Sequence, residues 1–359
     1  MSIAEQISDV LAGRSRWCVV TGDCLDVLRT IPSGSVDAVV TDPPYYRVKD
    51  EDWDRQWDSA DDFVEWLGVC AEGWRACLRA NGSLYVFASP EMAARVEVQV
   101  VGPKFFVLNS IRWVKEQGWH RKAERETLRS FLSPWEAIIF AEQRGDAYGK
   151  AERCLHKDVY APIGRRVQQV REAAGLARHE VDTACSPSRK PTGLCYRWEE
   201  GACLPTLDQW VALARACGDR REYEDLRREY EDLRREYEDL RREYEDLRRP
   251  FLLTPKDEPG DIWAFSPVMG YDGKHPCEKP VSMMRFIVRV SCRADAVVID
   301  PFCGSGATGV ACMQEGRRFI GIELDPGYAD IARRRIGEAA KHLFANTLGQ
   351  HDETPRENS

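Results

Sequence analysis

Residues 295–306 read Asp-Ala-Val-Val-Ile-Asp-Pro-Phe-Cys-Gly-Ser-Gly, and this stretch decides the fold class. The apolar run at 296–299 predicts a buried strand, and the glycines after it predict a tight turn. A helical pattern at 308–315 and an apolar run at 318–323 complete a strand–turn–helix–strand unit. Such a unit sets a helix N-terminus beside a glycine turn, where a ligand can approach the backbone closely.

Strand and helix patterns also alternate in the rest of the chain. Strands are predicted at 17–20, 36–40, 83–88, 111–114 and 137–140. Helices are predicted at 25–31, at 60–80 with Asn81-Gly82 as the stop, and at 328–344. This alternation is typical of a parallel α/β sheet. Residues 163–218 differ, because they predict several short helices and no strand.

A second motif, Thr41-Asp42-Pro43-Pro44-Tyr45, follows the apolar run at 36–40. An exocyclic amine is a poor nucleophile, because its lone pair is conjugated with the ring. The Asp42 carboxylate and the Pro43 carbonyl could accept both amino hydrogens, with the prolines fixing the loop. Tyr45 adds an aromatic face for stacking. The motif therefore predicts a pocket for a planar amino group.

The two motifs together resemble the amino-methyltransferases of DNA, and their order, catalytic before cofactor, resembles the beta class. The resemblance implies a Rossmann-like, circularly permuted S-adenosylmethionine-dependent methyltransferase sheet with an inserted helical domain. The implied reaction moves a methyl group to the exocyclic amine of a base flipped out of DNA. The implied catalytic residues are Asp42, Pro43, Pro44 and Tyr45.

Aspartate at position 42 favours adenine N6 as the methylated amine. Two alternatives remain open: a cytosine N4 enzyme with the same fold, and a non-catalytic DNA-binding regulator with a methylase-like body. A protein glutamine enzyme is disfavoured, because that group carries asparagine at this position. The intact motifs at 42–45 and 304–306 argue against the regulator.

The cofactor assignment rests on the same resemblance. Asp300 replaces the first glycine of the dinucleotide pattern, and a carboxylate suits a cationic cofactor better than a pyrophosphate does. Glu323 would hold the ribose hydroxyls, Asp23 would accept the adenosine amino group or cap the next helix, and Lys279 would flank the methionine end. The implied cofactor residues are Asp23, Cys24, Lys279, Asp300, Pro301, Phe302, Gly304, Ser305, Gly306, Thr308 and Glu323.

Residues 163–218 resemble a helix-turn-helix of the Cro/repressor type, although the turn from Cys185 to Pro191 is longer than in that family. A helical insert used only for packing is the alternative. The residues expected to face its core include Ile163, Val167, Val170, Leu176, Val181 and Ala184. The residues expected to hold phosphates are Arg112, Lys115, Arg121, Lys122, Arg125 and Arg129. Those expected to face the major groove are Arg189, Lys190, Thr192, Tyr196 and Arg197.

The charge distribution is compatible with this partner despite a net charge of −8. Residues 221–248 carry 8 arginines against 12 acids and supply half of the excess, whereas residues 104–130 carry 7 basic residues against 3 glutamates. Phosphate binding depends on local charge, so the basic stretch keeps double-stranded DNA as the expected partner.

Residues 221–248 are four copies of Arg-Glu-Tyr-Glu-Asp-Leu-Arg. The repeat predicts one helix about 42 Å long, with a tyrosine–leucine stripe and Glu224–Arg228 pairs. It could be a spacer, a coiled coil that makes a homodimer, a helix packed on the insert, or a repeat expansion without a selected role.

The expected domains are the catalytic half of the core at 1–160, the insert at 161–220, the heptad helix at 221–249, the cofactor half at 250–345 and a disordered tail at 346–359. The thirteen cysteines lack metal-ligand spacing, so we expect reduced thiols in a cytoplasmic protein and no metal site. The sequence has no signal-peptide pattern and no run of about 18 apolar residues. A cognate restriction endonuclease would be a further partner.

Overall fold

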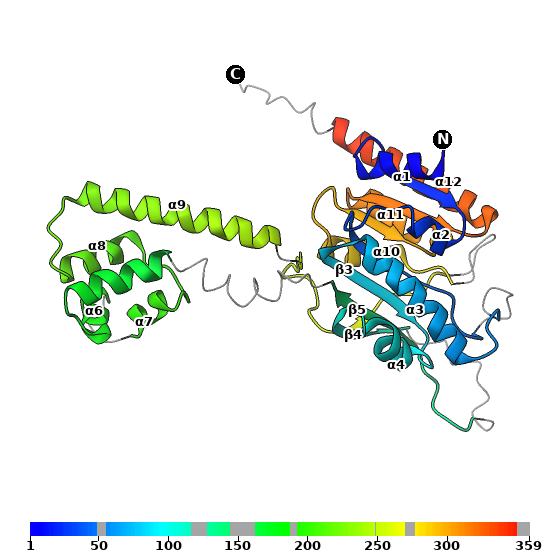
Figure 1. The fold of residues 1–359 in the computed structure, drawn as a ribbon, viewed down its shortest axis with the longest axis horizontal. Coiled ribbons are helices and arrows are strands. Elements are labelled where there is room, and N and C mark those ends of the chain that lie inside the picture. Colours follow the sequence, from blue (N-terminus) through cyan, green and yellow to red (C-terminus); the bar gives the residue numbers. More distant parts are fainter. Residues whose placement is uncertain are drawn as a thin grey trace, which may run out of the picture. The chain divides into compact units, whose positions relative to one another are not determined.

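The apolar run at 296–299 forms the centre of strand β7 (Val297–Asp300), which is buried along its whole length. Two parallel neighbours flank it, β8 (Arg318–Glu323) and β2 (Val36–Thr41). Within the described residues the sheet has eight strands, in the order β1-β8-β7-β2-β3-β5-β4-β6 (Figure 1). Strands buried on both faces read as continuous apolar runs, which is the pattern that predicted β7.

The structure is a computed structural model, and it describes residues 1–48, 55–115, 128–143, 162–186, 192–247, 249–269 and 277–349. Side chains are described up to Arg242 in the helix that ends at Leu247 and up to Lys341 in the helix that ends at Gly349. The chain forms two units. Unit 1 comprises Met1–Arg144 and Arg249–Ser359, and unit 2 comprises Gly145–Arg248.

Unit 1 contains the sheet and the helices on its two faces. Its remaining strands are β1 (Trp17–Thr21), β3 (Leu78–Ala88), β4 (Phe106–Val114), β5 (Trp135–Glu142) and β6 (Ile262–Ala264). Its helices are α1 (Ile3–Leu11), α2 (Cys24–Leu28), α3 (Ala60–Cys77), α4 (Ala93–Arg95), the π-helix η2 (Val96–Val101), α10 (Val281–Ser291), α11 (Ala307–Gln314) and α12 (Pro326–Gly349).

The expectation of a fully parallel sheet is wrong for β5. This strand pairs antiparallel with both β3 and β4, whereas the other pairs of the sheet are parallel. A short apolar run such as 137–140 shows that a strand is buried but carries no information about its direction. Because β5 is antiparallel, its first residues lie at the edge where the parallel strands end.

Two predicted boundaries also differ from the structure. α3 starts with a capping box between Ser59 and Asp62 but ends at Cys77, and β3 begins at once and runs through Asn81-Gly82. Leu78 is 1% exposed and pairs with Val36. Because of this pairing and burial, the residues from Leu78 onward form a strand and do not continue the helix. α12 continues to Gly349, past the predicted start of the tail at 346.

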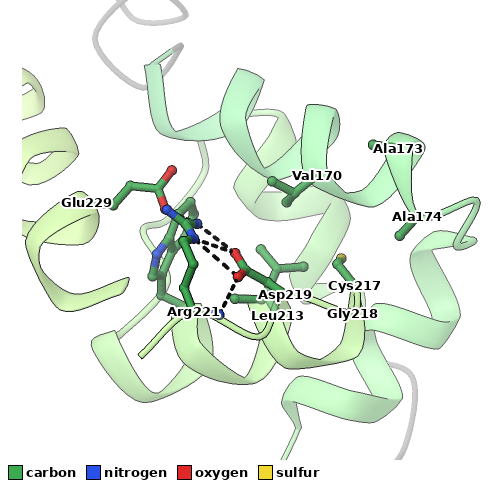
Figure 2. A pocket seen from close by; sticks show the side chains of 11 residues that line it. Val170, Ala173, Ala174, Leu213, Cys217, Gly218, Asp219, Arg221 and Glu229 are labelled. Carbon is green, nitrogen blue, oxygen red and sulfur yellow. Dashed lines mark hydrogen bonds and ion pairs between the residues drawn. The ribbon is translucent and has the colours of Figure 1, made fainter. Parts of the chain in front are cut away.

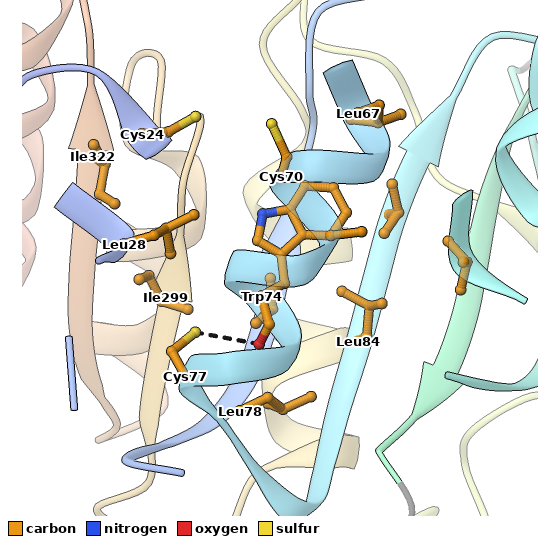
Figure 3. Packing of buried hydrophobic residues seen from close by; sticks show 14 of the residues in the cluster. Cys24, Leu28, Leu67, Cys70, Trp74, Cys77, Leu78, Leu84, Ile299 and Ile322 are labelled. Carbon is orange, nitrogen blue, oxygen red and sulfur yellow. Dashed lines mark hydrogen bonds between the residues drawn. The ribbon is translucent and has the colours of Figure 1, made fainter. Parts of the chain in front are cut away.

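Helices cover both faces of the sheet. On β7, Val297 and Ile299 pack with α1, α2 and α3, while Val298 packs with α10, α11 and α12. Figure 3 shows the first core, where Trp74 of α3 lies between the sheet and Leu28 of α2. This alternation along one strand gives the three-layer arrangement that brings the strand ends together at one edge.

A buried ion pair joins the two ends of unit 1 between which unit 2 is inserted. Arg249 Nε lies 3.0 Å from Glu142 Oε2, and the two side chains are 12% and 5% exposed. The Arg249 guanidinium also lies over the rings of Phe140 and Phe251. Residues 142 and 249 are therefore held at one place in unit 1.

Unit 2 is helical. It comprises residues 162–173, α6 (Arg178–Cys185), α7 (Leu194–Glu199), α8 (Leu207–Ala216) and α9 (Tyr223–Leu247). Ile163, Val167 and Val181 are buried as predicted, but Ala184 is exposed, because Cys185 takes the core position on that turn of α6.

The heptad helix α9 packs against its own unit. Leu226 and Tyr237 are buried, and Tyr230 donates a hydrogen bond to the Pro205 carbonyl at 3.0 Å. This arrangement agrees with the alternative of a helix packed on the insert. The predicted ion pairing differs in register, because Arg228 lies 3.9 Å from Asp225. Pairs at i,i+4 instead run from arginine to glutamate, as in Arg227–Glu231 and Arg234–Glu238.

The described cysteines are free thiols. Among the described residues, no helix combines the length and the apolar character needed to cross a bilayer.

Trp74 provides a test of the three-layer core. It is 0% exposed, so we expect Trp74→Ala to lower the free energy of unfolding by about 3–5 kcal/mol. Val69 lies on the same helix but is 47% exposed, and Val69→Ala should change it by less than about 0.5 kcal/mol. Urea denaturation followed by circular dichroism measures both variants. Equal losses would mean that α3 does not bury Trp74 against the sheet.

Candidate functional site

A cavity of about 480 Å³ lies where β1, β2, β7 and β8 end, and it unites the two sequence motifs. Polar groups at the carboxyl ends of parallel strands are the usual place for a ligand in such sheets. The predicted residues that line it are Asp23, Cys24, Asp42, Pro43, Pro44, Tyr45, Lys279, Asp300, Pro301, Phe302, Gly304, Ser305, Thr308 and Glu323.

Gly306 is the predicted cofactor residue that does not line this cavity. Its φ is +84°, and it precedes α11 as the N-cap. A Cβ at this position would meet Ala332 atoms at 3.0 Å and Ile336 at 3.1 Å, both on α12. Gly306 therefore allows the turn to adopt a left-handed conformation and α12 to approach it closely.

Asp300 closes the floor of the cavity at the end of β7. Its carboxylate accepts from Thr308 Oγ1 at 2.6 Å and from the Phe302 backbone N–H at 3.2 Å. Burial raises the pKa of this carboxyl to about 7, although both hydrogen bonds favour the ionised form. The pKa of Asp300 therefore lies near neutral pH, and a cation bound beside it would favour the ionised carboxylate.

Glu323 and Asp23 stand at the ends of β8 and β1. The Glu323 carboxylate accepts from the backbone N–H groups of Gly304 and Asp325, at 2.7 and 2.9 Å, which fixes its orientation in the cavity. Burial raises the pKa of Glu323. Asp23 accepts from the Leu25 N–H at 2.8 Å, so the capping role weighed for it is present and it still lines the cavity.

The lining is strongly acidic. The described lining residues include one basic side chain, Lys279, and the acids Asp23, Asp42, Glu278, Asp300, Glu323 and Asp325. Such a lining favours a cationic ligand and opposes a pyrophosphate. It therefore distinguishes this site from the dinucleotide site that a glycine turn alone would suggest.

Asp42 lies largely buried after the end of β2 and has two unlike oxygens. Oδ2 accepts from Lys279 Nζ at 2.5 Å, whereas Oδ1 is buried and has no hydrogen-bond partner among the described residues. Burial raises the pKa of Asp42, and the Lys279 ammonium opposes that effect. A buried acceptor without a hydrogen bond costs free energy, so Oδ1 is well suited to accept a hydrogen bond from an amino group.

Lys279 therefore contacts the Asp42 carboxylate, and it also lines the cavity with the residues predicted to bind the cofactor. It is 5% exposed and lies directly before α10. Burial alone would lower the pKa of Lys279, but the carboxylates of Asp42 and Glu136 raise it above the ordinary lysine value. The ammonium stays protonated at neutral pH.

Glu136 is a site residue that the sequence analysis missed. It lies at the start of β5, where its Oε2 accepts from the Tyr45 hydroxyl at 3.1 Å and lies 3.3 Å from Lys279 Nζ. Its Oε1 lies 2.5 Å from Lys115 Nζ. Burial would raise the pKa of Glu136, but the ammonium groups of Lys279 and Lys115 outweigh burial and lower it.

Two further contacts at the glycine turn were missed. Ser305 Oγ donates to Glu278 Oε2 at 2.9 Å, and Arg335 of α12 donates to Ser305 and to Glu278. The Phe302 ring lies 5.8 Å from that of Trp66, which also lines the cavity. Trp66 lies on the apolar face of α3, and helical spacing alone does not distinguish a core position from a cavity wall.

The predicted DNA contacts are only partly described. Arg121, Lys122, Arg125, Arg189 and Lys190 lie outside the described residues. Arg129 and Arg197 are exposed. In unit 1, Lys115 is engaged by Glu136, and the Arg112 guanidinium lies 4.4 Å from the Trp135 ring centroid.

Unit 2 has a second, smaller cavity of about 240 Å³, shown in Figure 2. Val170, Ala173 and Ala174 form part of its wall, and Arg221 at its edge is paired with Asp219 and Glu229. It contains none of the predicted site residues, so the cavity of unit 1 is the candidate active site.

Comparisons with known proteins show which family the chain resembles. The pattern of a family described as DNA methylase (N6_N4_Mtase) matches residues 36–334. DNA adenine methyltransferase YhdJ of Escherichia coli K12 is 25% identical over 342 residues, covering 94% of this chain and 88% of that protein.

Two more relatives are distant. Type II methyltransferase M.HinfI of Haemophilus influenzae is 22% identical over 335 residues, covering 89% of this chain and 68% of that protein. The solved structure of the PvuII DNA methyltransferase, cytosine-N4-specific, is 13% identical with a TM-score of 0.49, covering 93% of each chain.

Gly306 allows a test of the turn that shapes the cavity. Gly306→Ala combines left-handed strain with a clash against α12, so we expect it to lower the free energy of unfolding by more than about 2 kcal/mol. Gly316, after the end of α11, has φ +71° and open space where a methyl group would lie, so Gly316→Ala isolates the strain at about 1–2 kcal/mol. Chemical denaturation compares them, and equal losses would contradict the close approach of α12.

Proposed function

The chain belongs to the DNA methylase family, and on this premise we propose that it transfers a methyl group from S-adenosylmethionine to the N6 amine of adenine in double-stranded DNA. One observation carries the proposal. Asp42, whose buried Oδ1 has no hydrogen-bond partner among the described residues, lines the same cavity as residues 300–305, which include Asp300 and the glycine turn.

Asp42 and the Pro43 carbonyl act on the target amine. Asp42 Oδ1 accepts one amino hydrogen and the carbonyl accepts the other, which favours a tetrahedral nitrogen with an available lone pair. The nitrogen–carbon bond then forms as the sulfur–carbon bond breaks, and the nitrogen gives up one proton. Asp42 Oδ1 is the nearest acceptor for that proton, and burial raises its pKa toward this role. The base reaches the cavity by flipping out of the duplex.

The acidic lining supports S-adenosylmethionine as the methyl donor. Its sulfonium and ammonium groups supply positive charge, which the carboxylate of Asp300 complements. Glu323, fixed by two backbone amides, keeps a lone pair on each oxygen for the ribose hydroxyls, and Asp23 faces the adenine end. Asp300 and Glu323 thus bind and orient the donor, while Asp42 and Tyr45 position the acceptor.

Adenine is preferred to cytosine for two reasons. Aspartate at position 42 favours adenine by resemblance, and the relative YhdJ, which matches this chain over 88% of its own length, is named an adenine methyltransferase. Cytosine N4 methylation is the second candidate, since the same acceptors would serve that amine.

We assign target reading to unit 2 as a helix-turn-helix of the Cro/repressor type. Tyr196 is 52% exposed on α7, and Arg197 beside it is exposed as well. A cytoplasmic location follows from the DNA substrate, and the relative M.HinfI, named a type II methyltransferase, supports a paired restriction endonuclease. A homodimer through α9 is disfavoured, because Leu226 and Tyr237 are already buried.

Sequencing tests the proposal as a whole. DNA from cells that express the chain should carry N6-methyladenine at one sequence motif in long-read sequencing. N4-methylcytosine at such a motif would establish the second candidate, and unmodified DNA together with no transfer from tritiated donor would exclude both.

Asp42→Ala separates chemistry from cofactor binding. We expect kcat to fall by at least about 10²–10³-fold, because a preorganised electrostatic contact at the reacting nitrogen is lost. The dissociation constant for S-adenosylmethionine, measured by calorimetry, should stay within about threefold.

Glu323→Ala is the reciprocal variant and should weaken cofactor binding by about tenfold or more, as for one charge-assisted hydrogen-bonded contact. Unchanged cofactor affinity in this variant would contradict the ribose assignment.

Asp300 predicts a pH dependence of cofactor binding. Because its pKa is raised to about 7 in the free protein, and a cation binds the ionised form, affinity should rise with pH and level off above about 7. Between pH 7 and pH 6 the affinity should fall by severalfold, approaching tenfold per pH unit further down. Asp300→Asn should bind more weakly and lose this dependence. A wild-type affinity that is constant from pH 5.5 to 8 would contradict the role.

A further inference from the structure

Asp42 presents a geometric problem that the proposed function leaves open. The two oxygens of a free carboxylate are equivalent, and the group can rotate, yet the transfer needs one oxygen at one place. In the structure the two are distinguished by Lys279, whose Nζ lies 2.5 Å from Oδ2 while Oδ1 stays unpaired.

Lys279 is itself held. Its Nζ lies 3.3 Å from Glu136 Oε2, the oxygen that also accepts from the Tyr45 hydroxyl at 3.1 Å. The Lys279 side chain is 5% exposed and that of Glu136 is 13% exposed, so water competes little for these contacts. One glutamate oxygen thereby fixes both the ammonium and the aromatic residue of the 42–45 motif.

The cluster is also balanced in charge. Asp42 and Glu136 supply two carboxylates, and Lys279 and Lys115 supply two ammonium groups. A buried carboxylate without such partners would take up a proton and lose its acceptor character. The Lys279 ammonium lowers the pKa of Asp42 against the effect of burial, and so favours its acceptor form.

From this geometry we propose that Lys279 and Glu136 are positioning residues for methyl transfer: Lys279 anchors Oδ2 of Asp42 so that Oδ1 meets the substrate amine, and Glu136 anchors Lys279 and Tyr45 together. This inference rests on the proposed function and adds two residues to it. Neither residue needs to touch the base or the methyl donor.

The two residues act on Asp42 with opposite charge, which gives a distinctive signature. The Lys279 ammonium lowers the pKa of Asp42, and the Glu136 carboxylate raises it. An acid limb of the pH profile of kcat that reports Asp42 should therefore move to higher pH in Lys279→Met. In Glu136→Gln, which keeps the side-chain shape, the limb should move to lower pH.

The experiment measures kcat and KM on duplex DNA between pH 5 and 9 for both variants. We expect kcat at the optimum to fall at least tenfold, with KM for DNA and for S-adenosylmethionine within about threefold of wild type. Glu142→Gln is the matched control: Glu142 is a buried glutamate on the same strand whose ion pair is with Arg249, whereas that of Glu136 is with Lys279. Its profile should match that of the wild type.

Opposite shifts of the acid limb support the proposal. An acid limb that stays in place in both variants, or a change confined to KM, overturns it. If Lys279→Met does not fold, Glu136→Gln alone decides, since its carboxamide fills the same space. A wild-type protein that transfers no methyl group to any DNA would refute the proposed function instead, so the two failures are distinguishable.

Discussion

The buried contact between Asp42 and Lys279 is the interaction on which the site depends. It joins a residue at the end of β2 to a residue that precedes α10, 237 positions later in the chain. Removing Lys279 would leave the Asp42 carboxylate buried without this ammonium partner, at a cost of several kcal/mol. The pair therefore couples the docking of the 277–279 segment to the geometry of the catalytic loop.

The same coupling extends to both ends of the cavity. Lys279 follows Glu278, which is held by Ser305 of the glycine turn and by Arg335 of α12. The short segment 277–279 thus contacts the Asp42 carboxylate through Lys279 and Ser305 of the glycine turn through Glu278. A methyl donor and its acceptor must be aligned within a fraction of an ångström. One segment that contacts both parts of the site helps to keep that alignment fixed.

Sequence alone predicted the parts of this site that are local patterns. Asp42 and Asp300 both end apolar strands, and glycines mark the turn at 304–306, so their place at one sheet edge followed from strand order. Glu136 could not be found in this way, because one acid at the start of a strand is not distinctive in a chain with 59 acids. Its role depends on the antiparallel direction of β5, which the apolar run at 137–140 does not encode.

In the fold, too, local sequence patterns predicted some features, whereas features that depend on tertiary contacts were missed. Strands β7 and β8 matched closely, since each is a run of mostly buried residues, whereas the short, largely exposed β6 was not predicted. The end of α3 did not, because pairing of Leu78 with Val36 overrides the helical tendency of 78–80. Gly306 was placed in the cavity by its motif, yet it serves the contact with α12, and a motif cannot separate these two reasons for a glycine.

The buried Arg249–Glu142 pair has a consequence for how such a protein can diversify. Because the chain leaves unit 1 and returns to it at one clamped point, the length and content of residues 145–248 are decoupled from the sheet. Whole heptads can be gained or lost there without displacing a catalytic atom. The inserted unit can therefore vary in length and sequence while the sheet and its cavity keep their geometry.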